Sequence, residues 1–137
     1  MRKVLDAWAV LAWINGEVPA VQALQKLLDD AEGGQVELGM CMVNAGEVFY
    51  RLAKTRGLDF ARSFWDDFQT TSVQFLDAPN WLIFEAANWK SKYAISYADA
   101  FAIATAVRQD APLVSGDPDF QVFRSNGAVK IEWIGRE

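Results

Sequence analysis

The sequence predicts a three-layer α/β/α sandwich with a central parallel sheet. Short apolar segments alternate with helical ones along the chain, which is typical of a parallel sheet covered on both faces. Acidic residues stand where several strands should end or helices begin. No repeat, low-complexity segment or long linker divides residues 1–137, so we expect a single domain with a sizeable core.

The first half of the chain predicts two strands and four helices. Pro19 suits the first turn of a helix, and Gly33-Gly34 suit the end of the same helix. Gly57 separates the two helices that follow the second strand. The predicted elements are, in order, strand 3–5, helices 7–14 and 18–31, strand 36–41, and helices 44–56 and 59–70.

The second half continues the alternation, with a strongly apolar helix at its centre. The helix over 97–109 is apolar on every side, so we expect it to be buried, and its alanines allow neighbouring elements to approach closely. The predicted elements are strand 73–76, helices 79–91 and 97–109, and strands 112–115 and 129–133.

Four acidic residues at the predicted strand ends and helix starts have mostly apolar neighbours. Burying an ionised carboxylate lowers the stability of a protein by several kcal/mol unless a partner compensates the charge. Sites in open parallel sheets form beyond the carboxyl ends of the strands. A shared divalent cation is the simplest partner for four such acids, which are Asp6, Glu47, Asp99 and Asp117.

Each acid also has an ordinary structural interpretation as a helix cap. Asp6 can cap the helix after the first strand, and Asp117 precedes a proline suited to the first helical position. Asn44-x-x-Glu47 and Ser96-x-x-Asp99 have the spacing of capping boxes. Capping does not require all four acids to face one end of a sheet, so the conjunction favours a metal site, and the two roles can coexist.

The composition restricts the kind of metal. The chain has no histidine and one cysteine, Cys41, so an internal disulfide and a zinc site of soft ligands are both excluded. A metal held here has oxygen ligands, which favours Mg²⁺ or Mn²⁺.

The helix that begins near Asn44 carries a second signal. Asn44, Glu47, Arg51 and Lys54 are spaced by three, four and three residues and so share one face. One interpretation is a solvated face with a Glu47–Arg51 pair, and the other is a ridge that contacts phosphates beside the metal.

Charge and apolar content bear on partners and location. The net charge of −5 requires any nucleic-acid site to be a local basic patch and suits a basic protein partner. Six tryptophans exceed what a small core needs, which predicts a homodimer or partner interface. Asp6 interrupts the apolar stretch before Ile14, and no run reaches membrane length, so we expect a cytoplasmic protein with no targeting segment.

Four motifs in this order resemble the PIN domain, in particular the VapC-type toxins of toxin–antitoxin pairs. They are Val4-Leu5-Asp6-Ala7, Asn44-x-x-Glu47, Tyr97-x-Asp99-Ala100 with the alanine-rich helix after it, and the run from Leu113 to Phe120. No single motif is specific, but their order and separation span almost the whole chain. The position of Ser115 is often threonine in relatives, and serine keeps the hydroxyl.

The resemblance implies a PIN-like sandwich with metal-dependent endoribonuclease activity, in which water activated by the metal attacks a phosphodiester. It also implies the toxin of a type II pair, a protein antitoxin partner, a homodimer, and structured RNA targets such as transfer RNA or ribosomal RNA. It assigns the catalytic and metal-binding roles to Asp6, Glu47, Asp99 and Asp117, with Asn44, Ser115 and Asp119 as supporting residues.

Two other classes of protein stay open at this point. A phosphate-accepting receiver domain shares an aspartate after the first strand, but Leu5 precedes Asp6 where a second acid is expected, and Lys130 lies inside the last predicted strand. A non-catalytic PIN-like RNA-binding or scaffold protein keeps the fold without turnover. Incubation with RNA, with and without a chelator, separates these classes.

Overall fold

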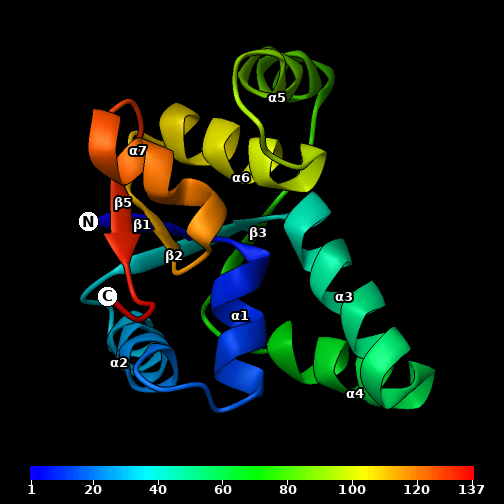
Figure 1. The fold of residues 1–137 in the computed structure, drawn as a ribbon. Helices are drawn as coiled ribbons and strands as arrows, with labels where there is room; N and C mark the ends of the chain where they lie inside the picture. The colour runs from blue at the N-terminus through cyan, green and yellow to red at the C-terminus, as the bar shows by residue number, and fades with distance from the viewer.

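The computed structural model describes all residues 1–137 and contains one five-stranded sheet (Figure 1). Every strand pair is parallel, in the order β3-β2-β1-β4-β5. In the register of the central strand, Val4 pairs with Gly39 on one side and with Leu113 on the other. The strands are β1 (Arg2–Leu5), β2 (Glu37–Cys41), β3 (Gln74–Leu76), β4 (Leu113–Ser115) and β5 (Ile131–Trp133).

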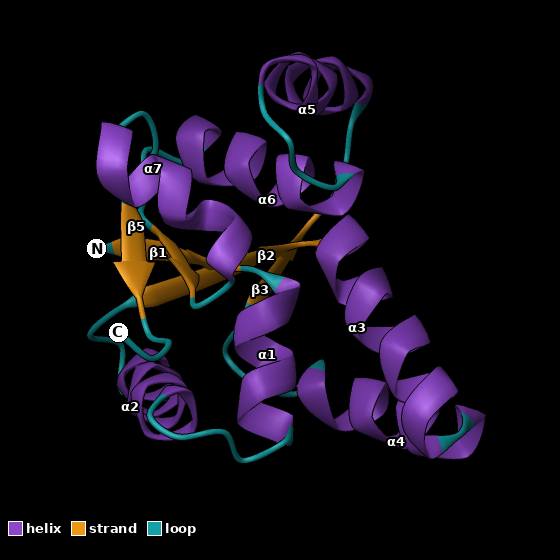
Figure 2. Cartoon of the chain, viewed as in Figure 1, coloured by secondary structure: helices purple, strands orange, loops and turns teal.

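Helices cover both faces of the sheet, which confirms the predicted α/β/α sandwich (Figure 2). They are α1 (Ala7–Ile14), α2 (Ala20–Glu32), α3 (Met42–Arg56), α4 (Leu58–Phe68), α5 (Asn80–Lys92), α6 (Tyr97–Arg108) and α7 (Gln121–Asn126). A 3₁₀ turn over Pro118–Phe120 precedes α7. No helix combines the length and the apolar character needed to cross a lipid bilayer.

Alternating side chains along the strands explain why there are two apolar layers. Leu5 and Val114 point into the layer beneath α1–α4, whereas their neighbours Val4 and Leu113 point into the layer beneath α5–α7. Successive side chains of a strand face opposite sides of the sheet, so a strand that is apolar throughout requires cover on both faces.

Helix α6 is the most buried helix, as its composition predicts. The residues from Ala100 to Ala106 are all buried, and the helix packs against three strands, α3 and α5. The small alanine side chains let these elements approach closely. The first turn of α6 is therefore held rigidly at the edge of the core, and it carries Asp99.

Two expectations from the sequence are wrong. Helix α3 begins at Met42, directly after β2, so Asn44 and Glu47 lie inside the helix and do not form a capping box. The N-cap residue is Cys41, which makes no side-chain capping bond. Helix α7 was not expected, because its six residues are too few to show a helical period.

Candidate metal centre

The ends of the adjacent strands β1 and β4 are joined by a chain of hydrogen bonds. Asp6 follows β1 and caps α1, accepting the Ala9 backbone N–H at 2.8 Å. Its other carboxylate oxygen accepts the Ser115 hydroxyl at 2.5 Å, and the Ser115 oxygen accepts the Asp117 backbone N–H at 3.0 Å. The capping interpretation of Asp6 is thus confirmed, and Ser115 links Asp6 to the loop that carries Asp117.

Asp6 is the buried member of the group, with 2% of its surface exposed. Burial raises the pKa of Asp6 to about 8, because the ionised carboxylate loses its hydration. Hydrogen bonds from Ser115 and the Ala9 backbone act in the opposite direction, and the negative charges of Asp99 and Asp117 add to the increase. A nearby cation would stabilise the ionised carboxylate and so lower the pKa of Asp6.

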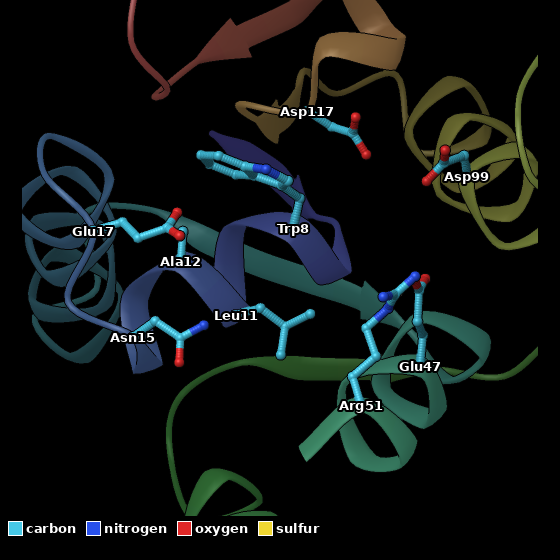
Figure 3. A pocket seen from close by; sticks show the side chains of 9 residues that line it. All are labelled: Trp8, Leu11, Ala12, Asn15, Glu17, Glu47, Arg51, Asp99 and Asp117. Atoms are coloured by element: carbon cyan, nitrogen blue, oxygen red, sulfur yellow. The ribbon is translucent and has the colours of Figure 1, made fainter. Parts of the chain in front are cut away.

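Three acids from two distant segments meet beyond β4. One carboxylate oxygen from each of Asp99, Asp117 and Asp119 lies within 4.8 Å of the other two. The Ser96 hydroxyl caps α6 by accepting the Asp99 N–H at 3.0 Å, and Asp117 accepts the Asp119 N–H at 2.9 Å. These local bonds confirm the capping interpretations of Ser96 and Asp117 and leave the carboxylate of Asp99 directed to its acidic neighbours (Figure 3).

Burial and the neighbouring negative charges raise the pKa values of Asp99 and Asp117. Burial, and then the charge of Asp117, raises the pKa of Asp99 to about 6. Burial also raises the pKa of Asp117, with further contributions from Asp119 and Glu47. Asp99 and Asp117 therefore hold protons more tightly than isolated carboxylates do, and a nearby cation would favour their ionised forms.

Glu47 faces this group from α3 and is held there by Arg51 (Figure 3). Arg51 donates from Nε to Glu47 Oε2 at 2.9 Å, and this hydrogen bond raises the pKa of Arg51. The other carboxylate oxygen, Oε1, is buried and has no hydrogen-bond partner. The i,i+4 pair predicted from the sequence is confirmed, and it leaves one oxygen available to a ligand.

Asn44 connects α3 to the helix that carries Asp99. Its side chain is 1% exposed, and Nδ2 donates to the Ala98 carbonyl at 2.9 Å. Its Oδ1 has no partner. Because Ala98 directly precedes Asp99, this bond fixes the first turn of α6 against α3.

An open cleft of about 310 Å³ lies over these side chains (Figure 3). Glu47, Arg51, Asp99 and Asp117 line it on one side, and residues of α1 line it on the other. Asp6 lies beneath the cleft rather than in its wall, and Lys54 lies one helical turn beyond Arg51 in a neighbouring groove. Trp8, expected from the sequence in a core or an interface, lines the cleft two residues after Asp6.

The donor set suits a hard cation. All candidate ligands are carboxylate or amide oxygens, which Mg²⁺ and Mn²⁺ prefer. Two buried oxygens, Asn44 Oδ1 and Glu47 Oε1, lack partners inside the protein, although buried acceptors are normally satisfied. The residues present therefore fit a divalent cation or its bound waters.

The sequence profile of the PIN domain family matches residues 3–125. No curated protein sequence matches the chain.

Solved structures share the fold at low sequence identity. VapC20 of Mycobacterium tuberculosis, a toxin that cleaves the sarcin–ricin loop, has a TM-score of 0.71 at 16% identity, covering 93% of this chain and 95% of its own. VapBC2 of Rickettsia felis, bound to promoter DNA, has a TM-score of 0.70 at 16% identity over 96% and 98%. VapBC-1 of nontypeable Haemophilus influenzae has a TM-score of 0.68 at 13% identity over 97% and 98%. At these identities the similarity establishes the fold alone.

Proposed function

Because this chain belongs to the PIN domain family, a family of nucleases, we propose that it is a divalent-metal-dependent endoribonuclease, the toxin of a toxin–antitoxin pair. The observation that carries the proposal is the meeting of Asp99 and Asp117 with Asp119, where Asp99 and Asp117 line an open cleft together with Glu47. Hydrolysis of a phosphodiester by water needs no nucleophilic side chain, which agrees with a site of acids, an amide, a hydroxyl that is bonded to Asp6, and the cationic Arg51.

The residues divide into those that would hold Mg²⁺ or Mn²⁺ and those that orient them. Asp6, Asp99 and Asp117, with Glu47, are the proposed ligands, directly or through water, and Asp119 is an auxiliary acid. Ser115 orients Asp6 by donating to it, and Asn44 holds the first turn of α6. A bound divalent ion lowers the pKa of water and offsets the charge that develops on the phosphate.

Arg51 is proposed to contribute twice. Its Nε holds Glu47, and more than half of its side chain is exposed beside the cleft. The remaining guanidinium nitrogens are free to donate to a phosphate oxygen. Lys54 lies next along α3 and extends the basic surface, so we expect RNA to run along this helix from the cleft toward Lys54.

The test of the proposal is cleavage of RNA with and without a chelator. The wild-type protein should cleave structured RNA, either transfer RNA or ribosomal RNA, in Mg²⁺ or Mn²⁺ and leave 5′-phosphate ends, since the 3′-oxygen departs. Asp99→Asn should abolish cleavage while the protein remains folded, because one carboxylate charge of the cluster is lost. The matched control is Asp66→Asn on the exposed surface of α4, which should cleave like the wild type.

The outcome of this assay also separates the enzyme from a scaffold. Chelator-insensitive binding of RNA without cleavage would contradict the nuclease and favour a non-catalytic RNA-binding protein. Mapping of RNA 5′ ends after brief expression in cells would identify both the RNA target and the cleaved position.

An antitoxin is the proposed protein partner. The net charge of −5 and the acidic cleft suit a partner that presents a basic side chain. Expression of the protein alone should arrest growth, and co-expression with a small open reading frame, if one lies directly upstream of the gene, should remove both this toxicity and the ribonuclease activity. Continued toxicity under co-expression would contradict the pairing. The proposal places the protein in the cytoplasm, where its RNA targets are found.

A homodimer is the proposed assembly, and α5 offers a surface for it. Phe84 is 75% exposed and Trp81 is 48% exposed on this helix. Phe84→Lys should convert a dimer to a monomer in light scattering, whereas the substitution of the exposed Asp66 by Asn should not. A wild-type protein that is monomeric at micromolar concentration would contradict the assembly.

A further inference from the structure

A second cleft shares a wall with the acidic cleft. It encloses about 610 Å³, within the range of small-molecule sites, and lies beside the loop after β4. Trp8 lines both clefts. Gly116, between Ser115 and Asp117, forms part of the second cleft, so the backbone that supports the acids also forms this neighbouring surface.

The Trp8 ring is held in a defined orientation by the glycines beneath it. A Cβ at Gly116 would lie 2.4 Å from two carbons of the ring and 2.7 Å from the Gly135 Cα. Only glycine allows this approach, so the indole lies directly against the main chain. Figure 3 shows the ring beside Asp117, on the side of the cleft away from Arg51.

Trp8 differs from the other five tryptophans in having no ring or cation packed against it. Trp13, Trp65 and Trp89 each pair with an aromatic ring. Trp81 and Trp133 each lie under an arginine, at 4.3 Å from the ring centroid. Trp8 is partly exposed and lines both clefts. An oriented, partly exposed ring that no other ring or cation covers is suited to stacking.

The second cleft also offers hydrogen-bond donors for a planar ligand. Gln121 accepts from Arg124 through its carbonyl oxygen, which leaves its amide NH₂ free to donate. Arg136 uses Nε to donate to the Val18 carbonyl, which leaves its two terminal nitrogens. With Glu17 in the same cleft, the lining mixes both signs of charge, so it suits a neutral polar ring better than a charged chain.

We propose that Trp8 stacks on an unpaired RNA base next to the scissile phosphate, with the second cleft as the subsite that receives this base. The inference rests on the proposed ribonuclease function and adds a specificity-determining residue to it. A phosphate over the acids is one ribose away from its base, and Trp8 is the residue that joins the two clefts. Base–aromatic stacking tolerates every base, so the Gln121 and Arg136 donors supply the preference among bases.

The test compares an RNA that has bases with one that has none. The probes are a labelled oligouridylate octamer and an abasic ribose-phosphate octamer of the same length, bound in Ca²⁺ over a time in which no product forms. Trp8→Leu should weaken oligouridylate binding about tenfold or more, and Trp8→Phe should stay within about threefold of wild type. Binding of the abasic octamer should be the same in all three proteins. Phe60→Leu on α4, an exposed aromatic residue outside both clefts, is the matched control and should change neither.

Three outcomes would overturn the subsite. The wild type could bind both octamers with equal affinity, or Trp8→Leu could lose affinity for both octamers equally. The wild type could also fail to bind oligouridylate while binding a basic peptide through Trp8. If Trp8→Leu does not fold, Gln121→Ala tests the same cleft and should weaken oligouridylate alone; an unchanged affinity would contradict the subsite.

Cleavage measured in Mg²⁺ on the same variants separates the two proposals. Normal cleavage by the wild type without base-dependent binding removes the subsite and keeps the nuclease. Base-dependent binding without cleavage removes the nuclease and keeps the subsite.

Discussion

The Asp6→Asn substitution should stabilise the metal-free protein at neutral pH while removing its proposed activity. Burial raises the pKa of Asp6 from 3.8 in the unfolded chain to about 8. Below pH 3.8 both states carry the proton, and Asp6 does not affect unfolding. Between these pKa values only the unfolded state is ionised, so the free energy of unfolding falls as pH rises, and the loss is complete above pH 8.

The size of this effect follows from the two pKa values. At 1.36 kcal/mol per pKa unit, the loss at pH 7 is about 4 kcal/mol, and at pH 4.5 it is about 1 kcal/mol. Asparagine carries no charge and avoids the loss. Its Oδ1 can still accept the Ala9 N–H, but its amide replaces the oxygen that accepted the Ser115 hydroxyl. The Ser115 hydroxyl then needs another acceptor, which costs about 1–2 kcal/mol.

The expected balance therefore depends on pH. In a chelator at pH 7, Asp6→Asn should be more stable than wild type by about 2–3 kcal/mol, and at pH 4.5 it should be equal or slightly less stable. Urea unfolding at both pH values measures the difference in the free energy of unfolding between variant and wild type. The contributions of the other titrating groups largely cancel in this difference. Asp66→Asn is the control, and its difference from wild type should not change with pH. A difference for Asp6→Asn that stays constant within about 1 kcal/mol, or decreases as pH rises, would refute the reasoning.

Three further expectations concern the metal, the basic residue and the loop after β4. Millimolar Mg²⁺ should raise the melting temperature, and by more at pH 8 than at pH 5, because the ligands must be ionised; no shift in differential scanning fluorimetry at either pH would argue against the site. Arg51→Ala should lower RNA cleavage about tenfold or more while changing stability by less than about 1 kcal/mol, since its pair with Glu47 is largely exposed on the arginine side. A large loss of stability there would instead make Arg51 structural. Gly116→Ala should destabilise by about 1–3 kcal/mol because its Cβ meets Trp8 and Gly135, whereas Gly46→Ala, with open space and a helical position, should be neutral or stabilising; similar urea midpoints for the two variants would contradict the packing.

Much of the fold and part of the site follow from local sequence features. The alternation of short apolar and helical segments predicted an α/β/α sandwich, and all five expected strands and six expected helices are present with shifts of a few residues at their ends. Two features were missed. Helix α7 is too short to show a helical period, and α3 begins at Met42, directly after β2, rather than at a polar cap. The type of ligand was also predictable, because a chain with no histidine and one buried cysteine can offer a metal only oxygen.

The sequence by itself determined the layers of the fold and the chemistry of the ligands, since apolar alternation, caps and residue types act over a few neighbouring positions. Only the tertiary structure decided which acids meet. Asp99 reaches Asp117 and Asp119 because α6 packs across β1, β2 and β4, which lie side by side in the sheet, so its first turn lies beside the loop after β4. In the same way, packing alone put Trp8 between two clefts and left the buried oxygens of Asn44 and Glu47 without partners. These relations depend on strand order and on the close approach of Gly116 and Gly135, which no local pattern encodes.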